Sequence, residues 1–405
     1  MEHTLPMSLK TLDKLDIIHR VERKELSQVD AGKMLKVTPR TVYTYLNRLL
    51  KEGPGFLTHG LKGQISNNRM SLKMEKRIGD LLQTKYPDFG STFAAEKLRE
   101  IHELDYDPKT IGRIQKSLGV YVISRKSKKV TYHSYRVRRA TYGELLQFDG
   151  SYHDWLESRG GIDELCLLLC IDDATGRILH AWFAPHEGVL PVMGFWLEYA
   201  KIHGLPQSIY LDRFSTYSMN VKLAAENPDT LTQFERAAKD AGVEVVHAYS
   251  SQAKGRVERC FKTLQDRLVK EMRLAGISTV EDANQFLLGI FIPDFNRRFE
   301  VEARGNGDLH RIPSKGELQD VLPYIFCRHD TRVVQNDFTI SYDALWYQLL
   351  PTPRLAVRPR DTVDVHKHPD ESLSLLVRGR PANFIPLPEK PKRRTRSKHP
   401  QTLTL

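Results

Sequence analysis

The sequence predicts a multidomain protein: helical units first, a mixed α/β domain in the middle, and a small C-terminal β-barrel. Three observations predict this order. Helical periodicity with capping residues runs through the first 124 residues, apolar runs alternate with helices between 141 and 325, and short strands follow Pro323. A chain of 405 residues is long enough for two to four domains with their own cores.

Composition excludes several classes of protein. With 40% hydrophobic and 27% charged residues, the chain is expected to fold and not to be disordered. The longest apolar run, Leu165 to Ile171, is too short to cross a bilayer, and the first ten residues lack the apolar stretch of a secretory signal. Four cysteines without a CxxC pair argue against a disulfide scaffold or a zinc ribbon. We therefore expect a reduced, cytoplasmic protein with no membrane segment.

Charge is distributed unevenly along the chain. The net charge of +11 divides into +13 for residues 1–140, −8 for 141–330 and +6 for 331–405. Basic ends favour contact with phosphate backbones. An acidic middle fits carboxylates that hold divalent metal, and it equally fits an ordinary acidic domain.

Residues 1–60 are predicted to form a helix-turn-helix domain. Ala31 and Gly32 allow close packing in the first helix, and Thr38 with Pro39 can cap and start the second. An apolar face recurs at helical spacing in Val42, Leu46, Leu49 and Leu50. The outward polar residues suit base edges and phosphates, and a solvated polar face is the alternative: Arg40, Thr41, Thr44, Asn47 and Arg48.

Residues 61–124 are predicted to form a second helical DNA-binding unit. One helix is predicted from the spacing of the apolar residues Phe93, Leu98 and Ile101. Asp107 and Pro108 open the next, in which the apolar positions are Ile111, Ile114 and Leu118 and the outward basic ones are Lys109, Arg113 and Lys116.

Residues 125–140 read as a basic linker. Seven lysines and arginines lie between 125 and 139 without an acidic residue or a regular period. A linker that follows a phosphate groove fits this composition, and so does a solvated loop. The residues expected to contact DNA are Lys126, Lys128, Lys129, Arg136, Arg138 and Arg139.

Residues 141–325 are predicted to form the α/β domain. The pattern gives a strand at 142–155 and two strands within 164–183 that are joined by a turn at 172–176. A helix at 188–203, a strand at 208–212, a helix at 232–242, a strand at 243–250 and a long helix at 251–272 follow. Asp149 and Asp212 end strands, and Glu258 lies on the first turns of the long helix. Lys254 and Arg256 flank Glu258 and can touch phosphates. Asp172 and Asp173 lie in a turn, where local hydrogen bonding is the favoured role and metal binding the alternative.

Residues 326–387 are predicted to form the small barrel, from apolar runs at 331–335, 338–342, 345–350, 362–367 and 373–378. Residues 388–405 form a basic, Pro-containing tail without a core-forming pattern, which we expect to be disordered and attracted to DNA.

The chain resembles the DDE transposases of the retroviral-integrase superfamily, and most closely the bacterial insertion-sequence transposases of the ISNCY type. The motifs that carry the resemblance are QFDGSYHDW (147–155), YLDRFSTY (210–217), FNRRF (295–299) and the long stretch from Ser250 to Thr279. It implies an RNase H-like catalytic core at 141–325 and an SH3-like barrel after it. It also implies that Asp149, Asp212 and Glu258 are both the catalytic residues and the metal ligands. Many relatives have Lys or Arg at the position of Gln265, and Lys262 can take over that DNA contact.

The function implied is a DNA transposase that binds inverted repeats, nicks the element's ends and joins the 3′-OH to target DNA. Two Mg²⁺ ions, replaceable by Mn²⁺, would support phosphodiester transfer. Double-stranded DNA and at least a second copy of the chain are the expected partners, in a bacterial, nucleoid-associated setting. A non-catalytic helix-turn-helix regulator and a structure-selective nuclease are the alternatives.

Overall fold

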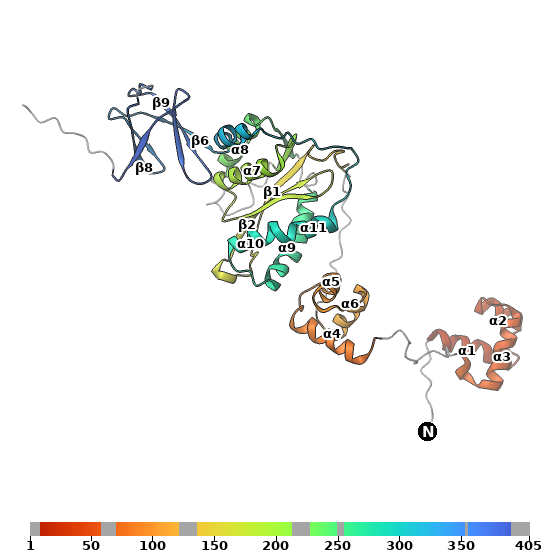
Figure 1. The fold of residues 1–405 in the computed structure, drawn as a ribbon. Coiled ribbons are helices and arrows are strands. Elements are labelled where there is room, and N and C mark those ends of the chain that lie inside the picture. Colours follow the sequence, from red (N-terminus) through yellow and green to blue (C-terminus); the bar gives the residue numbers. More distant parts are fainter. Residues whose placement is uncertain are drawn as a thin grey trace, which may run out of the picture. The chain divides into compact units, whose positions relative to one another are not determined.

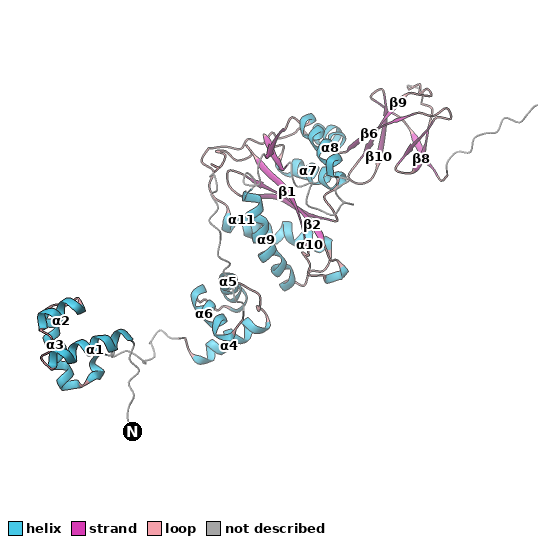
Figure 2. Cartoon of the chain, turned by 180° about the vertical axis from the view of Figure 1, so that it is seen from behind, coloured by secondary structure: helices cyan, strands magenta, loops and turns pink. Residues whose placement is uncertain are grey.

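A computed structural model of the chain describes residues 9–57, 70–120, 136–212, 227–248, 255–352 and 355–389. The chain divides into two compact units, Met1–Ser127 and Lys128–Leu405. The described part of the first unit contains only helices, whereas the second combines helices and strands (Figure 2).

The first three helices are α1 (Leu9–Glu22), α2 (Gln28–Leu35) and α3 (Pro39–Glu52), followed by the 3-10 turn η1 (Pro54–Leu57). Thr38 caps α3 as expected, because its side chain accepts a hydrogen bond from the Thr41 backbone N–H. The turn between α2 and α3 requires Gly32, since a Cβ there would lie 2.8 Å from the Val37 carbonyl oxygen. The predicted close packing at this glycine is therefore confirmed.

One detail of α3 differs from the prediction. Val42 and Leu49 are buried, but Leu50 is 65% exposed. Eight residues at about 100° each place Leu50 about 80° around the helix from Val42, off the buried stripe.

The next helices are α4 (Leu72–Thr84), α5 (Ser91–His102) and α6 (Pro108–Leu118), and Asp107 caps α6. Their shared core includes Phe93, Leu98, Ile111 and Ile114. Ile101, like Leu50, lies eight residues beyond the first apolar residue of its helix and is 53% exposed.

A five-stranded sheet with the order β3-β2-β1-β4-β5 forms the centre of the second unit. Its strands are β1 (Leu146–His153), β2 (Leu165–Asp172), β3 (Ile178–Ala184), β4 (Ser208–Asp212) and β5 (Glu244–Ala248). Strand β2 is antiparallel to both β1 and β3, whereas β4 is parallel to both β1 and β5. This mixed sheet fits the RNase H-like core that the resemblance implies.

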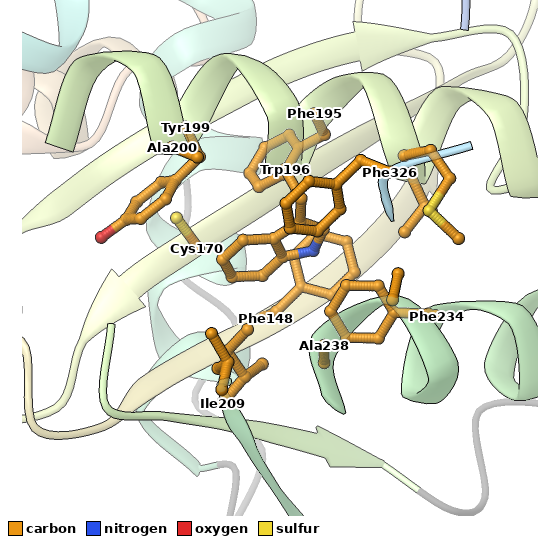
Figure 3. Packing of buried hydrophobic residues seen from close by; sticks show 14 of the residues in the cluster. Phe148, Cys170, Phe195, Trp196, Tyr199, Ala200, Ile209, Phe234, Ala238 and Phe326 are labelled. Carbon is orange, nitrogen blue, oxygen red and sulfur yellow. The ribbon is translucent and has the colours of Figure 1, made fainter. Parts of the chain in front are cut away.

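Helices cover both faces of this sheet (Figure 1). On one face lie α7 (Val189–His203) and α8 (Asn227–Asp240), where Phe148, Trp196 and Phe234 pack together (Figure 3). On the other lie α9 (Gly255–Leu274), α10 (Val280–Phe286), the π-helical turn η5 (Leu287–Phe291) and α11 (Ile292–Phe299). Helix α9 turns an apolar stripe toward the sheet, and its residues are all buried: Val257, Phe261, Leu264, Leu268 and Met272.

The C-terminal β module follows the π-helical turn η6 (Glu317–Val321) and α12 (Leu322–Ile325). Its strands are β6 (Arg328–Val333), β7 (Thr339–Tyr342), β8 (Leu345–Leu349), β9 (Thr362–Lys367), β10 (Leu373–Val377), β11 (Arg380–Pro381) and β12 (Phe384–Leu387). The pairing gives two sheets, β11-β10-β9-β6 and β12-β8-β7, over one core that includes Val363, Val365 and Ile340. Among the described residues the ladders do not close, so the predicted barrel is observed as two sheets sharing a core.

No helix in the described ranges is long and apolar enough to cross a membrane.

Candidate active site

Asp149 and Asp212 lie on neighbouring parallel strands. Leu146 pairs with Ile209 and Gln147 with Tyr210, and the same register continued by two residues brings Asp212 level with Asp149. Adjacent strands are about 4.8 Å apart, so the two backbones are close at this level. The side chain of Asp212 lies outside the described part.

Helix α9 runs along β1 on the face that carries Asp149. The Gln147 side-chain oxygen accepts a hydrogen bond from the Val257 N–H at 3.3 Å, and the Gln265 amide donates to Ser151 Oγ at 3.3 Å. Side chains alternate along a strand, so Asp149, between Gln147 and Ser151, shares their face. Because Glu258 follows Val257 directly, this packing brings the first turn of α9 to the carboxylate-bearing side of β1.

A buried carboxylate, Asp173, anchors this corner. The side chain of Asp173 is fully buried and accepts hydrogen bonds from Gln147 Nε2 at 2.6 Å, from Arg256 at 2.5 Å and from Arg136. The backbone N–H of Arg139 donates to it as well, at 2.8 Å. Gln147 therefore connects Asp173 to the N-terminus of α9. The sequence placed Asp173 in a turn without indicating these long-range contacts, and Gln147 was not singled out; its polar side chain between the apolar Leu146 and Phe148 was the available signal.

Asp172 serves the neighbouring turn. Its carboxylate accepts hydrogen bonds from the N–H and hydroxyl of Thr175 and from the Gly143 N–H. Burial raises its pKa, and these hydrogen bonds act against that rise. The local hydrogen-bonding role expected of the turn aspartates is confirmed for Asp172, whereas Asp173 bonds to residues 26 to 83 positions away.

The arginines predicted to contact DNA near this corner have partners within the protein. Arg136 and Arg256 pair with Asp173, and Arg138 donates to the Ala174 carbonyl. Desolvation lowers the pKa of Arg256, while Asp173 raises it. These contacts give Arg136 and Arg256 a structural role that sequence reasoning did not anticipate. Lys262 is exposed.

The remaining basic candidates divide into three groups. Arg40, Thr44 and Arg48 are exposed on α3, where Thr41 and Asn47 are partly buried; Arg48 also pairs with Glu52. Lys109, Arg113 and Lys116 are exposed on α6, as predicted. Lys126, Lys128, Lys129 and Lys254 lie outside the described residues.

Asp149 and Glu258 contribute carboxylate oxygens, the donor type that Mg²⁺ prefers. The donor chemistry of the described part of the candidate triad therefore fits a divalent ion.

Comparison with known proteins shows that the chain is a polynucleotidyl transferase of the transposase type. The chain is 36% identical over 343 residues to the putative transposase y4bF of Sinorhizobium fredii, covering 84% of this chain and 72% of that protein. It is also 36% identical over 226 residues to the transposase for insertion sequence IS1202 of Streptococcus pneumoniae, covering 56% of this chain and 46% of that one. The chain therefore belongs to the transposase family that these relatives represent.

Family profiles and solved structures give weaker similarity than these two transposases. No protein-family profile matches the chain. A chain of a simian T-cell lymphotropic virus intasome is 12% identical with a TM-score of 0.34, covering 77% of this chain and all of that one. The HTLV-2 integrase catalytic core with magnesium, in its dimeric form, is 14% identical with a TM-score of 0.27, covering 38% and 91%. Both scores are too low to support an inference about this chain.

Proposed function

We propose that the chain binds the inverted repeats of its own mobile element, nicks the ends and joins each freed 3′-OH to target DNA. Asp149, Asp212 and Glu258 hold Mg²⁺ in this proposal, two ions per site, with Mn²⁺ as a substitute. The β1–β4 register supports the proposal, since it brings two of these residues level on adjacent strands. The packing of α9 along the same face of β1 supports the third.

The chemistry requires no side-chain nucleophile. In the first step, a water oxygen bonds to phosphorus and a 3′ oxygen leaves. In the second, that 3′-OH oxygen bonds to a target phosphorus and another 3′ oxygen leaves. Bound Mg²⁺ would supply an activated nucleophile and a stabilised leaving oxygen. The three carboxylates would bind the metal ions and thereby orient the reacting oxygens. The hydrogen bonds of Gln147 and Asp173 keep α9 in place.

The DNA is held mainly outside this corner. The exposed polar faces of α3 and α6 are the proposed contacts with element ends, and Lys262 is the proposed phosphate contact near Glu258. Joining two ends requires two sites, so we propose a dimer or larger assembly on double-stranded DNA.

The test is a strand-transfer assay with end-containing DNA and Mg²⁺, comparing wild type with Asp149→Asn and Glu258→Gln. Each variant should lose about a thousandfold in rate, because several kcal/mol of transition-state stabilisation is removed and about 1.4 kcal/mol corresponds to tenfold. The exposed Asp163→Asn serves as the matched control and should keep wild-type activity.

Each outcome separates the alternatives. Unchanged joining by Asp149→Asn contradicts the triad. A wild-type protein that binds DNA without cleaving it is a regulator, and cleavage without joining indicates a nuclease.

A further inference from the structure

The C-terminal β module carries a second cluster of metal-ligand side chains, and none of them is a carboxylate. Cys327, His329 and His366 each offer one ligand atom, and these atoms lie within 4.8 Å of one another. The cluster lies between the end of α12 and strands β6 and β9, where the chain leaves the α/β core.

The β6–β9 pairing explains how the cluster arises. The sequence holds a Cys-x-His pair at 327–329 and a His-x-His pair at 366–368. Residues two apart on a strand share a face. The antiparallel register places His329 opposite His366, and the same register continued by one residue places Cys327 opposite His368. Four ligand-type residues therefore gather on one face of a two-stranded ribbon.

Each of the two imidazoles keeps one ring nitrogen available, whereas the Cys327 thiol donates to the Tyr324 carbonyl at 3.1 Å, a contact that metal binding would replace. Nε2 of His329 lies 2.8 Å from the Tyr324 carbonyl, which only accepts, so Nε2 carries the proton and Nδ1 keeps its lone pair. Among the described residues, the buried Nδ1 of His366 has no hydrogen-bond partner. A buried nitrogen without a partner is costly unless something binds it.

Hydrogen bonds from neighbouring residues hold the cluster in place. The Arg236 guanidinium donates to the Cys327 carbonyl at 2.6 Å and fixes the backbone there. His368 contacts the Pro323 carbonyl through Nδ1 and Ser374 Oγ through Nε2. Metal ligands in proteins are held by outer hydrogen bonds of this kind.

We propose that Cys327, His329 and His366 bind Zn²⁺, with water as the fourth ligand. A thiolate with imidazoles is a borderline-soft donor set that suits Zn²⁺ and not Mg²⁺. The ion would join β6 to β9 as a structural site, independent of the carboxylate corner.

Binding requires a small local change. The His329 and His366 rings are stacked with centroids 3.9 Å apart and planes 2° from parallel. Parallel rings cannot both direct a lone pair at one ion, so one imidazole must rotate about χ2, a soft torsion for histidine. Tetrahedral zinc ligands lie about 3.3–3.6 Å apart, so the ligand atoms must also move together by about 1 Å.

The test uses the untagged full chain, purified without chelator. We expect about one zinc ion per chain by elemental analysis. After exchange with Co²⁺, we expect the visible bands of a tetrahedral site and the near-ultraviolet thiolate-to-cobalt band. Cys327→Ser should abolish the thiolate band and lower zinc affinity at least tenfold, while Cys260→Ser, another buried free thiol, should change neither.

A second variant keeps the test decisive if Cys327→Ser fails to fold. His366→Asn should lower zinc affinity at least tenfold but retain the thiolate-to-cobalt band. Absence of zinc from the wild type together with no cobalt bands overturns the proposal. Equal zinc binding by wild type and both variants also overturns it, because the ion is then held elsewhere.

Discussion

At the scale of single residues, Asp173 determines more of the candidate site than its place in a turn suggested. Its fully buried carboxylate faces two arginines, and Arg256 is itself mostly buried. Asp173→Ala should destabilise the chain by about 3 kcal/mol, because it leaves partly buried guanidinium groups without a counter-charge. Because Arg136 is partly exposed, the expected loss of stability lies at the low end of the range for breaking a buried ion pair.

Urea unfolding measures this loss. The control is Asp163→Ala, at an exposed position of the same domain, which should change stability by less than about 0.5 kcal/mol. Equal midpoints for both variants would show that Asp173 is not an anchor.

His180 gives a prediction about acid stability. Burial lowers its pKa to about 4, and its Nε2 is buried without a partner among the described residues. The unfolded chain binds this proton near pH 6.5 and the folded chain does not, so stability is full above pH 6.5 and falls as pH drops towards 4. His180→Phe should remove about 2–3 kcal/mol of that fall, since the ring already packs on Phe195. A stability–pH profile as steep as that of the wild type would contradict this.

At the scale of elements, Gln147 on β1, 110 residues earlier in the sequence, caps the N-terminus of α9. The Val257 N–H belongs to the first turn, which has no partner within its own helix, and Gln147 supplies one. Gln147→Leu should cost about 2 kcal/mol of stability and reduce strand transfer more than Gln265→Ala, which breaks only the far contact with Ser151. Thermal unfolding and the joining rate, measured side by side, test this; equal effects of the two variants would contradict it.

Helix α3 allows stability and DNA binding to be separated. Thr38 caps the helix, whereas the Thr44 hydroxyl donates to the Arg40 carbonyl of its own helix. Thr38→Ala should lower the stability of the first unit by about 1 kcal/mol. Thr44→Ala should leave stability unchanged and weaken binding to end DNA. A loss of stability in both variants would contradict the assignment of Thr44 to the DNA-contacting face.

Elements were more predictable from the sequence than their exact faces and tertiary contacts. The helices could be predicted because their signals are local: the N-cap residues Thr38 and Asp107, and the helical spacing of the apolar stripe of α9. Leu50 and Ile101 could not be placed, because which flank of a stripe is covered depends on neighbouring helices. The Asp173 contacts join residues 37 and 83 positions apart, and no local pattern encodes them. The resemblance supplied the roles of Asp149 and Glu258; the strand register then gave a physical reason for two of the three positions.

At the scale of the whole molecule, charge and architecture together indicate where DNA affinity resides. Residues 1–127 carry 23 Lys and Arg against 15 Asp and Glu, net +8, which leaves +3 for the rest of the chain. They also form a separate compact unit, so they can be removed without cutting through a core. A shorter fragment, 141–330, would lose Arg136 and Arg139, two of the four residues that donate hydrogen bonds to Asp173. Weak binding by that fragment would not distinguish lost contacts from a disturbed fold.

The chain 128–405 is therefore the informative truncation. Each phosphate contact contributes about −0.9 to the slope of log affinity against log salt, so losing the contacts of α3 and α6 should flatten that slope by several units. Affinity for end DNA should fall at least a hundredfold at low salt, while affinities for end and unrelated DNA should converge, because the base-reading helices are gone. Fluorescence anisotropy across a salt series measures both quantities. If 128–405 kept the full chain's slope and its preference for end DNA, recognition would lie in the second unit, and the DNA-binding roles proposed for α3 and α6 would be wrong.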